Sequence, residues 1–136
     1  MSEVSKYELL IRESHLDTFG HVNNATYLVL YEEARWEVIS NKGYDLKYIQ
    51  KSKQGPVLLD VTVKFMRELK LREKIIITTE MVEQKGKIGK LKQTMVKEDG
   101  TVASEAIFTI ALFDTHERKI IEPTDAWKKA IGLIES

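Results

Sequence analysis

Asp17-Thr18-Phe19-Gly20-His21-Val22-Asn23-Asn24-Ala25-Thr26-Tyr27 is the stretch that decides the fold, because it sets a carboxylate just ahead of a turn and a helix start. Gly20 permits a tight turn that a Cβ would block, and Asn23 or Asn24 can cap the helix that Ala25 opens. The free N–H groups of that first turn, with the positive end of the helix dipole, suit an oxyanion or a polarised carbonyl oxygen. The stretch therefore predicts a carboxylate that faces backbone donors, which is the outline of a small hydrolytic site.

The elements on either side follow from the spacing of apolar residues. Residues 7–13 alternate as a short strand, and residues 25–41 repeat apolar side chains at three- and four-residue steps, as a long helix does. The first turns of this helix are apolar nearly all the way round, which is typical of a helix buried on several sides by a curled sheet. Gly43 can take the left-handed conformation that ends such a helix.

The remainder of the chain predicts strands. Period-two alternation covers residues 57–65, 74–83, 88–98 and 101–113, and a short closing helix covers residues 125–134. Residues 44–54 are expected to be a loop. Lys85-Gly86-Lys87 joins one strand pair, and Asp99-Gly100 joins the next as a type I′ hairpin. We therefore expect an α+β fold in which a strand and a long central helix are followed by an antiparallel meander, giving a curved sheet of about five strands.

Composition limits the class of protein, its partners and its location. The 136 residues predict one domain, residues 1–136, and 43% hydrophobic with 31% charged residues is typical of a soluble globular protein. Lys and Arg total 21, as do Asp and Glu, so nothing favours nucleic acid or an anionic membrane as a partner. No cysteine, signal-peptide pattern or membrane-length apolar run is present, so we expect a cytoplasmic location. No His, Asp or Glu set has metal-ligand spacing, so no metal is expected.

A sheet of about five long strands around one helix leaves its outer face and its edges in need of cover. Association commonly supplies that cover, so we expect a dimer or a higher oligomer.

The motif Asp17-x-x-Gly20-His21-Val22-Asn23-Asn24-x-x-Tyr27, followed by Glu32-Glu33-Ala34-Arg35, resembles the hotdog-fold acyl-CoA thioesterases of the 4-hydroxybenzoyl-CoA thioesterase type. The order of elements matches this family from about residue 7 to residue 113. The resemblance implies hydrolysis of an acyl-CoA thioester to free acid and CoA, with no cofactor apart from the CoA of the substrate. It also implies a homodimer, or a tetramer of two dimers, in which two subunits join their sheets and each active site lies at the dimer interface.

Two catalytic groups are implied by the same resemblance. Asp17 corresponds to the catalytic carboxylate, and the backbone N–H of Asn24 is expected to point at the thioester oxygen. Many relatives carry Asp-x-Asp at this place, whereas the first position of the pair is His15 here. His15 would tune Asp17 electrostatically, contact substrate, or simply lie on the solvent face of the strand. From spacing alone, Asp17 itself is equally well explained as a turn residue.

Five further residues have two readings each. His21 is either a base or donor to substrate, or a packing element of the turn. Glu33 is either a helix carboxylate that acts as base, or an interface residue paired with Arg35 or Arg12. Tyr27 and Tyr31 line the acyl pocket or the core. Lys90, in a basic run with Lys85, Lys87 and Lys92, would meet the CoA phosphates, or it belongs to a solvated face that discourages edge pairing.

Three functions stay open on the sequence alone. Hydrolysis of acyl-CoA leads, hydrolysis of an acyl group on a carrier protein is the catalytic alternative, and a non-catalytic module that binds acyl thioesters is the third. Fold does not separate them, because function depends on the site.

Overall fold

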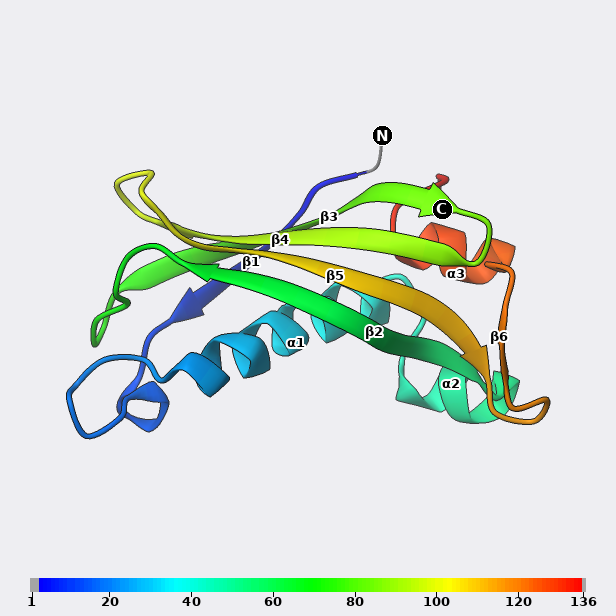
Figure 1. Ribbon diagram of the computed structural model, residues 1–136, viewed down its shortest axis with the longest axis horizontal. Helices are drawn as coiled ribbons and strands as arrows, with labels where there is room; N and C mark the ends of the chain where they lie inside the picture. Colours follow the sequence, from blue (N-terminus) through cyan, green and yellow to red (C-terminus); the bar gives the residue numbers. More distant parts are fainter. Residues whose placement is uncertain (1–2, 136) are drawn as a thin grey trace.

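The structure is a computed structural model that describes residues 3–135, in which one curved sheet lies over a long helix (Figure 1). The sheet is antiparallel throughout, in the order β1-β3-β4-β5-β2, and a short β6 pairs with the end of β5. In chain order the elements are β1 (Ser5–Leu10), the 3-10 helix η1 (Glu13–His15), α1 (Asn24–Ser40), α2 (Leu46–Ser52), β2 (Gln54–Phe65), β3 (Lys74–Lys85), β4 (Ile88–Lys97), β5 (Val102–Asp114), β6 (Lys119–Ile121) and α3 (Asp125–Ala130).

The core lies between α1 and the concave face of the sheet. Leu30, Tyr31 and Ala34 of α1 are buried there against inward-facing residues such as Ile77 and Phe108. The strands alternate buried and exposed positions, as a sheet with one covered face does. The expected α+β architecture, with a curved antiparallel sheet around a central helix, is confirmed.

α1 starts where the sequence predicts. The side chain of Asn23 caps the helix by accepting the N–H of Ala25 at 2.9 Å, which decides between the two candidate caps. One expectation for this helix is wrong: Leu28, Val29 and Trp36 are exposed, so one side of α1 stays open in the single chain. The sheet covers only the opposite side, because it curls around the helix without closing.

β2 departs most from the sequence-based expectation. It crosses the molecule to pair with β5 and is an edge strand, so the meander includes only β3, β4 and β5. A register shift between Leu58 and Asp60 interrupts its alternation. Leu59, Val61 and Phe65, which the pattern predicts as one face with Val57 and Val63, are exposed. Sequence pattern identifies the strand but not its neighbours, and an edge position leaves apolar side chains without cover.

Several boundaries also differ. β1 ends at Leu10 and not at residue 13, because Arg12 already precedes η1. The expected loop 44–54 contains α2, which Asp45 caps through the N–H of Tyr48, and β6 has no counterpart in the prediction. α3 stops at Ala130, four residues earlier than expected.

The Asp99-Gly100 turn joins β4 and β5 as predicted, but it is not type I′. Only Gly100 has a positive φ, at 89°, whereas type I′ needs positive φ at both central residues. The Asp99 side chain instead accepts the N–H of Thr101 at 2.8 Å, and Gly100 donates to the Lys97 carbonyl at 2.9 Å. The Gly100-to-Lys97 hydrogen bond closes a turn whose central residues are Glu98 and Asp99, and the left-handed Gly100 follows it, as in a hairpin loop that ends in a bulge.

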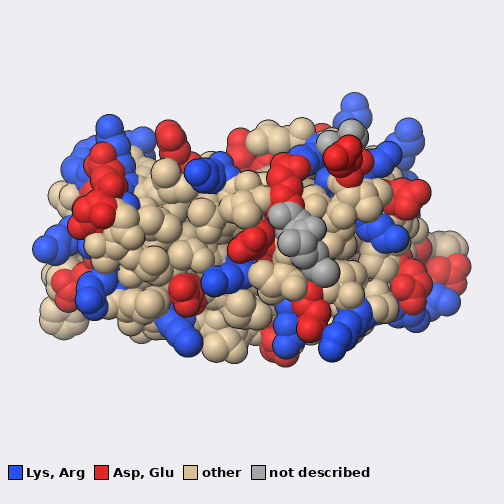
Figure 2. All heavy atoms as spheres, turned by 90° about the horizontal axis from the view of Figure 1, so that it is seen from above, with Lys and Arg blue, Asp and Glu red and all other residues tan. Residues whose placement is uncertain are grey.

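Seen from above, the molecule carries basic and acidic side chains intermixed, with uncharged surface between them (Figure 2). No helix in residues 3–135 has both the length and the apolar character that a bilayer crossing requires.

Candidate active site

The turn that carries Asp17 is held by its own hydrogen bonds. The Asp17 N–H donates to the His21 carbonyl at 2.8 Å, and the Gly20 N–H donates to the Asp17 carbonyl at 3.1 Å. Gly20 has φ of 81°, a left-handed conformation that glycine adopts without strain. Asp17 Oδ1 accepts the N–H of Phe19 at 2.8 Å and that of His21 at 3.4 Å. Within the described chain, Oδ2 has no protein hydrogen-bond partner and remains available to a ligand.

The first turn of α1 leaves one backbone donor open. The N–H groups of Thr26 and Tyr27 both donate to the Asn23 carbonyl, at 2.9 Å and 3.3 Å, and that of Ala25 donates to the Asn23 side chain. Asn24, the first helical residue, has no acceptor for its N–H among residues 3–135. The helix N-terminus therefore presents an unused N–H at Asn24, where the helix dipole favours negative charge.

Asp17 and Asn24 line the same surface hollow, which has a volume of about 330 Å³. His21, Val22 and Tyr27 also line it, and residues 65–68 at the end of β2 close it on the other side. The Tyr27 ring packs edge-on against Phe65 at 5.0 Å between centroids, and its hydroxyl lies 3.4 Å from the Arg67 carbonyl. Burial raises the pKa of Tyr27, so this side chain is a neutral wall of the hollow at physiological pH. The hollow thus combines a carboxylate, an open N–H donor and an aromatic wall.

His21 lies at the rim of the hollow. Its Nε2 is 3.2 Å from Glu68 Oε2, and both side chains are largely exposed, so the pair contributes little to stability. The contact joins the Asp17 turn to the segment after β2. Because His21 also lines the hollow, both the packing role and a contact with substrate stay predictions.

Two candidates lie away from the hollow. The Glu33 carboxylate accepts the Tyr7 hydroxyl at 2.5 Å, and this hydrogen bond raises the pKa of Tyr7 to about 12. Among the described residues it forms no ion pair with Arg35 or Arg12. His15 belongs to η1, where its Nδ1 is assigned as acceptor of the Arg12 N–H at 2.9 Å. Neither side chain lines the hollow.

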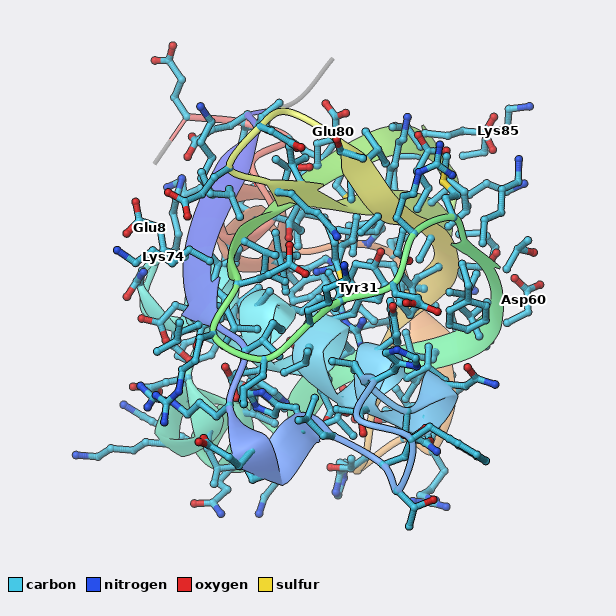
Figure 3. All side chains as sticks on the ribbon, turned by 90° about the vertical axis from the view of Figure 1, so that its left-hand side faces the viewer. Glu8, Tyr31, Asp60, Lys74, Glu80 and Lys85 are labelled. Atoms are coloured by element: carbon cyan, nitrogen blue, oxygen red, sulfur yellow. The ribbon has the colours of Figure 1, made fainter. Side chains whose placement is uncertain are left out.

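Tyr31 and Lys90 are also outside it. Tyr31 is fully buried and donates its hydroxyl to Ser104 Oγ at 2.7 Å, and it points from α1 toward the sheet (Figure 3). Lys90 is exposed on β4. On the same strand, Met95 pairs with Ser104 of β5, and Ser104 pairs in turn with Phe65 at the hollow. Lys90 is five residues away from Met95 along β4. Five strand residues span roughly 17 Å, so Lys90 does not reach the hollow of the same chain.

Residues 65–68 form a wall of the hollow that the sequence did not reveal. Phe65, Met66, Arg67 and Glu68 lie more than forty residues after Asp17, and no local motif marks them. Arg67 stands out only as one of several basic residues in that segment. Their contribution depends on where β2 ends in the folded sheet.

A second, smaller cavity of about 110 Å³ lies between the later part of α1 and the start of β2. Its walls are mostly apolar, and the charged side chains that line it are Glu32 and Arg35. No group of three His, Asp or Glu side chains that could hold a metal ion occurs in residues 3–135.

Comparisons with known proteins place the chain in a family. The profile of the Thioesterase-like superfamily matches residues 11–131. The chain is 30% identical over 115 residues to the long-chain acyl-CoA thioesterase FadM of Escherichia coli strain K12, covering 84% of this chain and 86% of FadM.

Solved structures show the same fold. The probable thioesterase YbaW from Escherichia coli superposes with a TM-score of 0.81 at 27% identity, over 92% of this chain and 94% of YbaW. A hypothetical protein from Staphylococcus aureus in complex with CoA gives a TM-score of 0.88 at 19% identity, over 96% and 83% of the two chains. The chain belongs to the Thioesterase-like superfamily, and the prediction of a hotdog-fold thioester hydrolase is confirmed.

Proposed function

We propose that this protein hydrolyses acyl-CoA thioesters with Asp17 as the reacting carboxylate and the Asn24 N–H as the donor to the developing oxyanion. The observation that carries the proposal is that the free Oδ2 of Asp17 and the unused N–H of Asn24 belong to residues that line one hollow. FadM, which is described as a long-chain acyl-CoA thioesterase, supports CoA thioesters as the substrate class.

Hydrolysis of a thioester requires little more than a reacting carboxylate and a donor to the oxyanion. Sulfur donates little resonance to the carbonyl and thiolate is a fair leaving group, so a thioester is already activated. In one route, Asp17 attacks the carbonyl carbon, the C–S bond breaks, and water hydrolyses the resulting anhydride. In the other route, Asp17 takes a proton from a water that attacks the carbonyl directly. In both routes negative charge develops on the carbonyl oxygen, and a preorganised N–H stabilises it by about 2.7–4 kcal/mol.

We also propose that two copies associate along the free edge of β2. Leu59, Val61 and Phe65 of this edge strand are exposed, as are Val29 and Trp36 on the open side of α1. An apolar strand edge without cover is a template for pairing with a second strand, and an isologous dimer uses the same edge twice. Such pairing would place the hollow at the end of β2 beside the partner.

The experiment that tests the function is release of free thiol from a panel of short, medium, long and aromatic acyl-CoAs. The same acyl groups on a carrier protein form the second arm, because pantetheine is common to both substrates. Hydrolysis of CoA thioesters at higher kcat/KM than carrier-protein thioesters is the expected result. Activity on the carrier protein alone would replace CoA as substrate, and tight binding without hydrolysis in either arm would make the protein a binding module.

A further inference from the structure

The small cavity between α1 and β2 has one charged side chain that is fixed in place. The Arg35 guanidinium lies over the Phe108 ring, with Cζ 4.3 Å from the ring centroid, and its Nη1 donates to Gln93 Oε1 at 3.0 Å. Gln93 is fully buried and is itself held, because its Nε2 donates to the Tyr31 carbonyl and to Thr79 Oγ1, each at 3.0 Å. The orientation of the guanidinium is therefore set before any ligand arrives.

Most donors of this guanidinium are unused. Arginine has five N–H donors, and a single hydrogen bond, to Gln93, is formed within the described chain. No carboxylate of residues 3–135 lies within 4.0 Å of Arg35, and in that part of the chain no fully buried side-chain nitrogen lacks a partner. The remaining N–H groups therefore reach space open to a ligand or to water, and Arg35 lines the cavity.

Glu32, Ser5 and Thr79 also line the cavity, and its other walls are apolar. The apolar walls include Val57, Leu58, Leu91, Ile110 and Trp127. At about 110 Å³ it is smaller than a cavity of about 150 Å³, which holds benzene, so it fits the last few atoms of a longer ligand. An apolar pocket with one placed polar group orients a ligand by that group.

The cavity and the Asp17 hollow lie along the same boundary between α1 and β2. At one end of this boundary Tyr27 contacts Phe65, and at the other end Arg35 and Val57 line the same cavity. The helix and the strand therefore run in opposite directions. Eleven residues of helix separate Asn24 from Arg35, a rise of about 16 Å. In an antiparallel pair of β2 strands centred on the two-fold axis, the partner's hollow would instead face this cavity. A rise of about 16 Å along the helix is a distance that the extended chain of a long acyl group spans.

We propose that the cavity receives the far end of the acyl group and that Arg35 selects acyl groups carrying an acceptor oxygen there. The proposal rests on the thioesterase function proposed above and adds its substrate class. A guanidinium only donates, so the recognised group is an oxygen acceptor, either a neutral hydroxyl or a carboxylate. An acyl group that fills the cavity keeps water from the N–H groups of Arg35, so an unsubstituted acyl group is disfavoured because it leaves them unpaired.

The test is a series of acyl-CoAs of increasing length, each supplied as the unsubstituted, the ω-hydroxy and the ω-carboxy form. For wild type we expect kcat/KM to be about 10-fold or more higher for at least one oxygenated form at the length that reaches Arg35. Arg35→Met should abolish this preference, and the two oxygenated arms tell a neutral acceptor from an anionic one. Equal kcat/KM for all three forms at every length, or a preference that survives in Arg35→Met, would overturn the proposal.

Two further variants keep the result interpretable. Arg118 also stacks on an aromatic ring, with Cζ 5.4 Å from the Phe113 centroid, but it does not line the cavity, so Arg118→Met should keep the wild-type preference. If Arg35→Met does not fold, Leu58→Trp narrows the cavity from an exposed position and should remove the preference while Arg35 stays in place. A folded Leu58→Trp protein with the full preference would also contradict the proposal.

Binding of inert thioether analogues separates the two proposals. S-alkyl-CoA and its ω-hydroxy and ω-carboxy forms cannot be hydrolysed, so calorimetry reports recognition without catalysis. Arg35-dependent preference in binding with no thioester hydrolysis would reject the proposed function and keep the cavity assignment. Thioester hydrolysis without an Arg35-dependent preference would keep the proposed function and reject the cavity assignment.

Discussion

Asp17 divides its carboxylate between two tasks. Oδ1 accepts N–H groups of its own turn, and Oδ2 is left without a protein partner. A side chain held through one oxygen presents the other in a fixed place, which is what a nucleophile or a general base requires. This division is the basis of the catalytic proposal at the residue scale.

The Tyr7–Glu33 hydrogen bond predicts how stability falls in alkali. The Glu33 carboxylate raises the pKa of the Tyr7 hydroxyl to about 12, above the usual value near 10 that the unfolded chain retains. The hydrogen bond contributes fully to the free energy of unfolding below about pH 10. This contribution is lost as the pH rises from about 10 toward 12, because in that range the unfolded chain releases the Tyr7 proton and the folded chain keeps it. Urea unfolding across this range should show a shallower loss of stability in Tyr7→Phe than in wild type. Glu33→Gln should behave similarly, and an unchanged slope in both variants would show that the pair does not shift the Tyr7 pKa.

At the scale of single elements, the start of α1 supplies the oxyanion donor. Asn24 is the first helical residue, where proline is tolerated because its φ suits the helix and its missing N–H breaks no helical hydrogen bond. Asn23 has extended dihedrals, φ −66° and ψ 147°, which are compatible with a following proline. Asn24→Pro should therefore keep the fold and lower kcat by about 10²–10³-fold through loss of one donor.

Asn24→Ala is the matched control, because it removes the side chain and keeps the backbone N–H. Its kcat should stay near that of wild type, and circular dichroism should show the same helix content in both variants. A fully active Asn24→Pro protein would assign the oxyanion to another donor.

Gln93 couples α1 to the sheet. It bonds the Arg35 guanidinium, the Tyr31 carbonyl and the Thr79 hydroxyl from a fully buried position on β4. Gln93→Met removes these three hydrogen bonds from a buried position and should lower the free energy of unfolding by about 1–3 kcal/mol. Gln84→Met, which removes only a hydrogen bond to Gly86 at an exposed hairpin, should change it by less than about 0.5 kcal/mol. Equal urea midpoints for the two variants would contradict this account of the helix–sheet contact.

The elements differ in how far the sequence predicts them. α1 and its cap are predicted because Asn23 and the apolar repeat act within a few residues. The place of β2 is not predicted, since alternation in residues 57–65 does not say which strand lies beside it. Asp17 and Asn24 belong to one motif, so the sequence predicts that they lie together, whereas residues 65–68 and the contact of Arg35 with Gln93 arise only when distant parts of the chain meet.

At the scale of the whole molecule, the free edge of β2 and the open side of α1 predict association. Val61 lies in the middle of this edge strand and is 39% exposed, so Val61→Arg would place a charge in the proposed interface. We expect sedimentation analysis to show the wild type as a dimer or larger and Val61→Arg as a monomer with reduced activity. Val82 on β3 is 40% exposed, and Val82→Arg should keep the wild-type assembly. Dissociation by Val82→Arg alone would move the interface to the outer face of the sheet.

The central claim is that Asp17 is the reacting carboxylate, and the most direct measurement is the hydrolysis rate of Asp17→Asn beside that of Asp99→Asn. Asp99 Oδ1 accepts the N–H two residues ahead at 2.8 Å, the same local contact that Asp17 makes, but at the β4–β5 turn. Asparagine keeps an acceptor oxygen in both turns, so both variants should fold with wild-type melting temperatures. We predict that Asp17→Asn lowers kcat by about 10²–10⁴-fold on the preferred acyl-CoA, whereas Asp99→Asn retains the wild-type rate. A folded Asp17→Asn protein with undiminished kcat would contradict the account and leave Asp17 as a turn residue only.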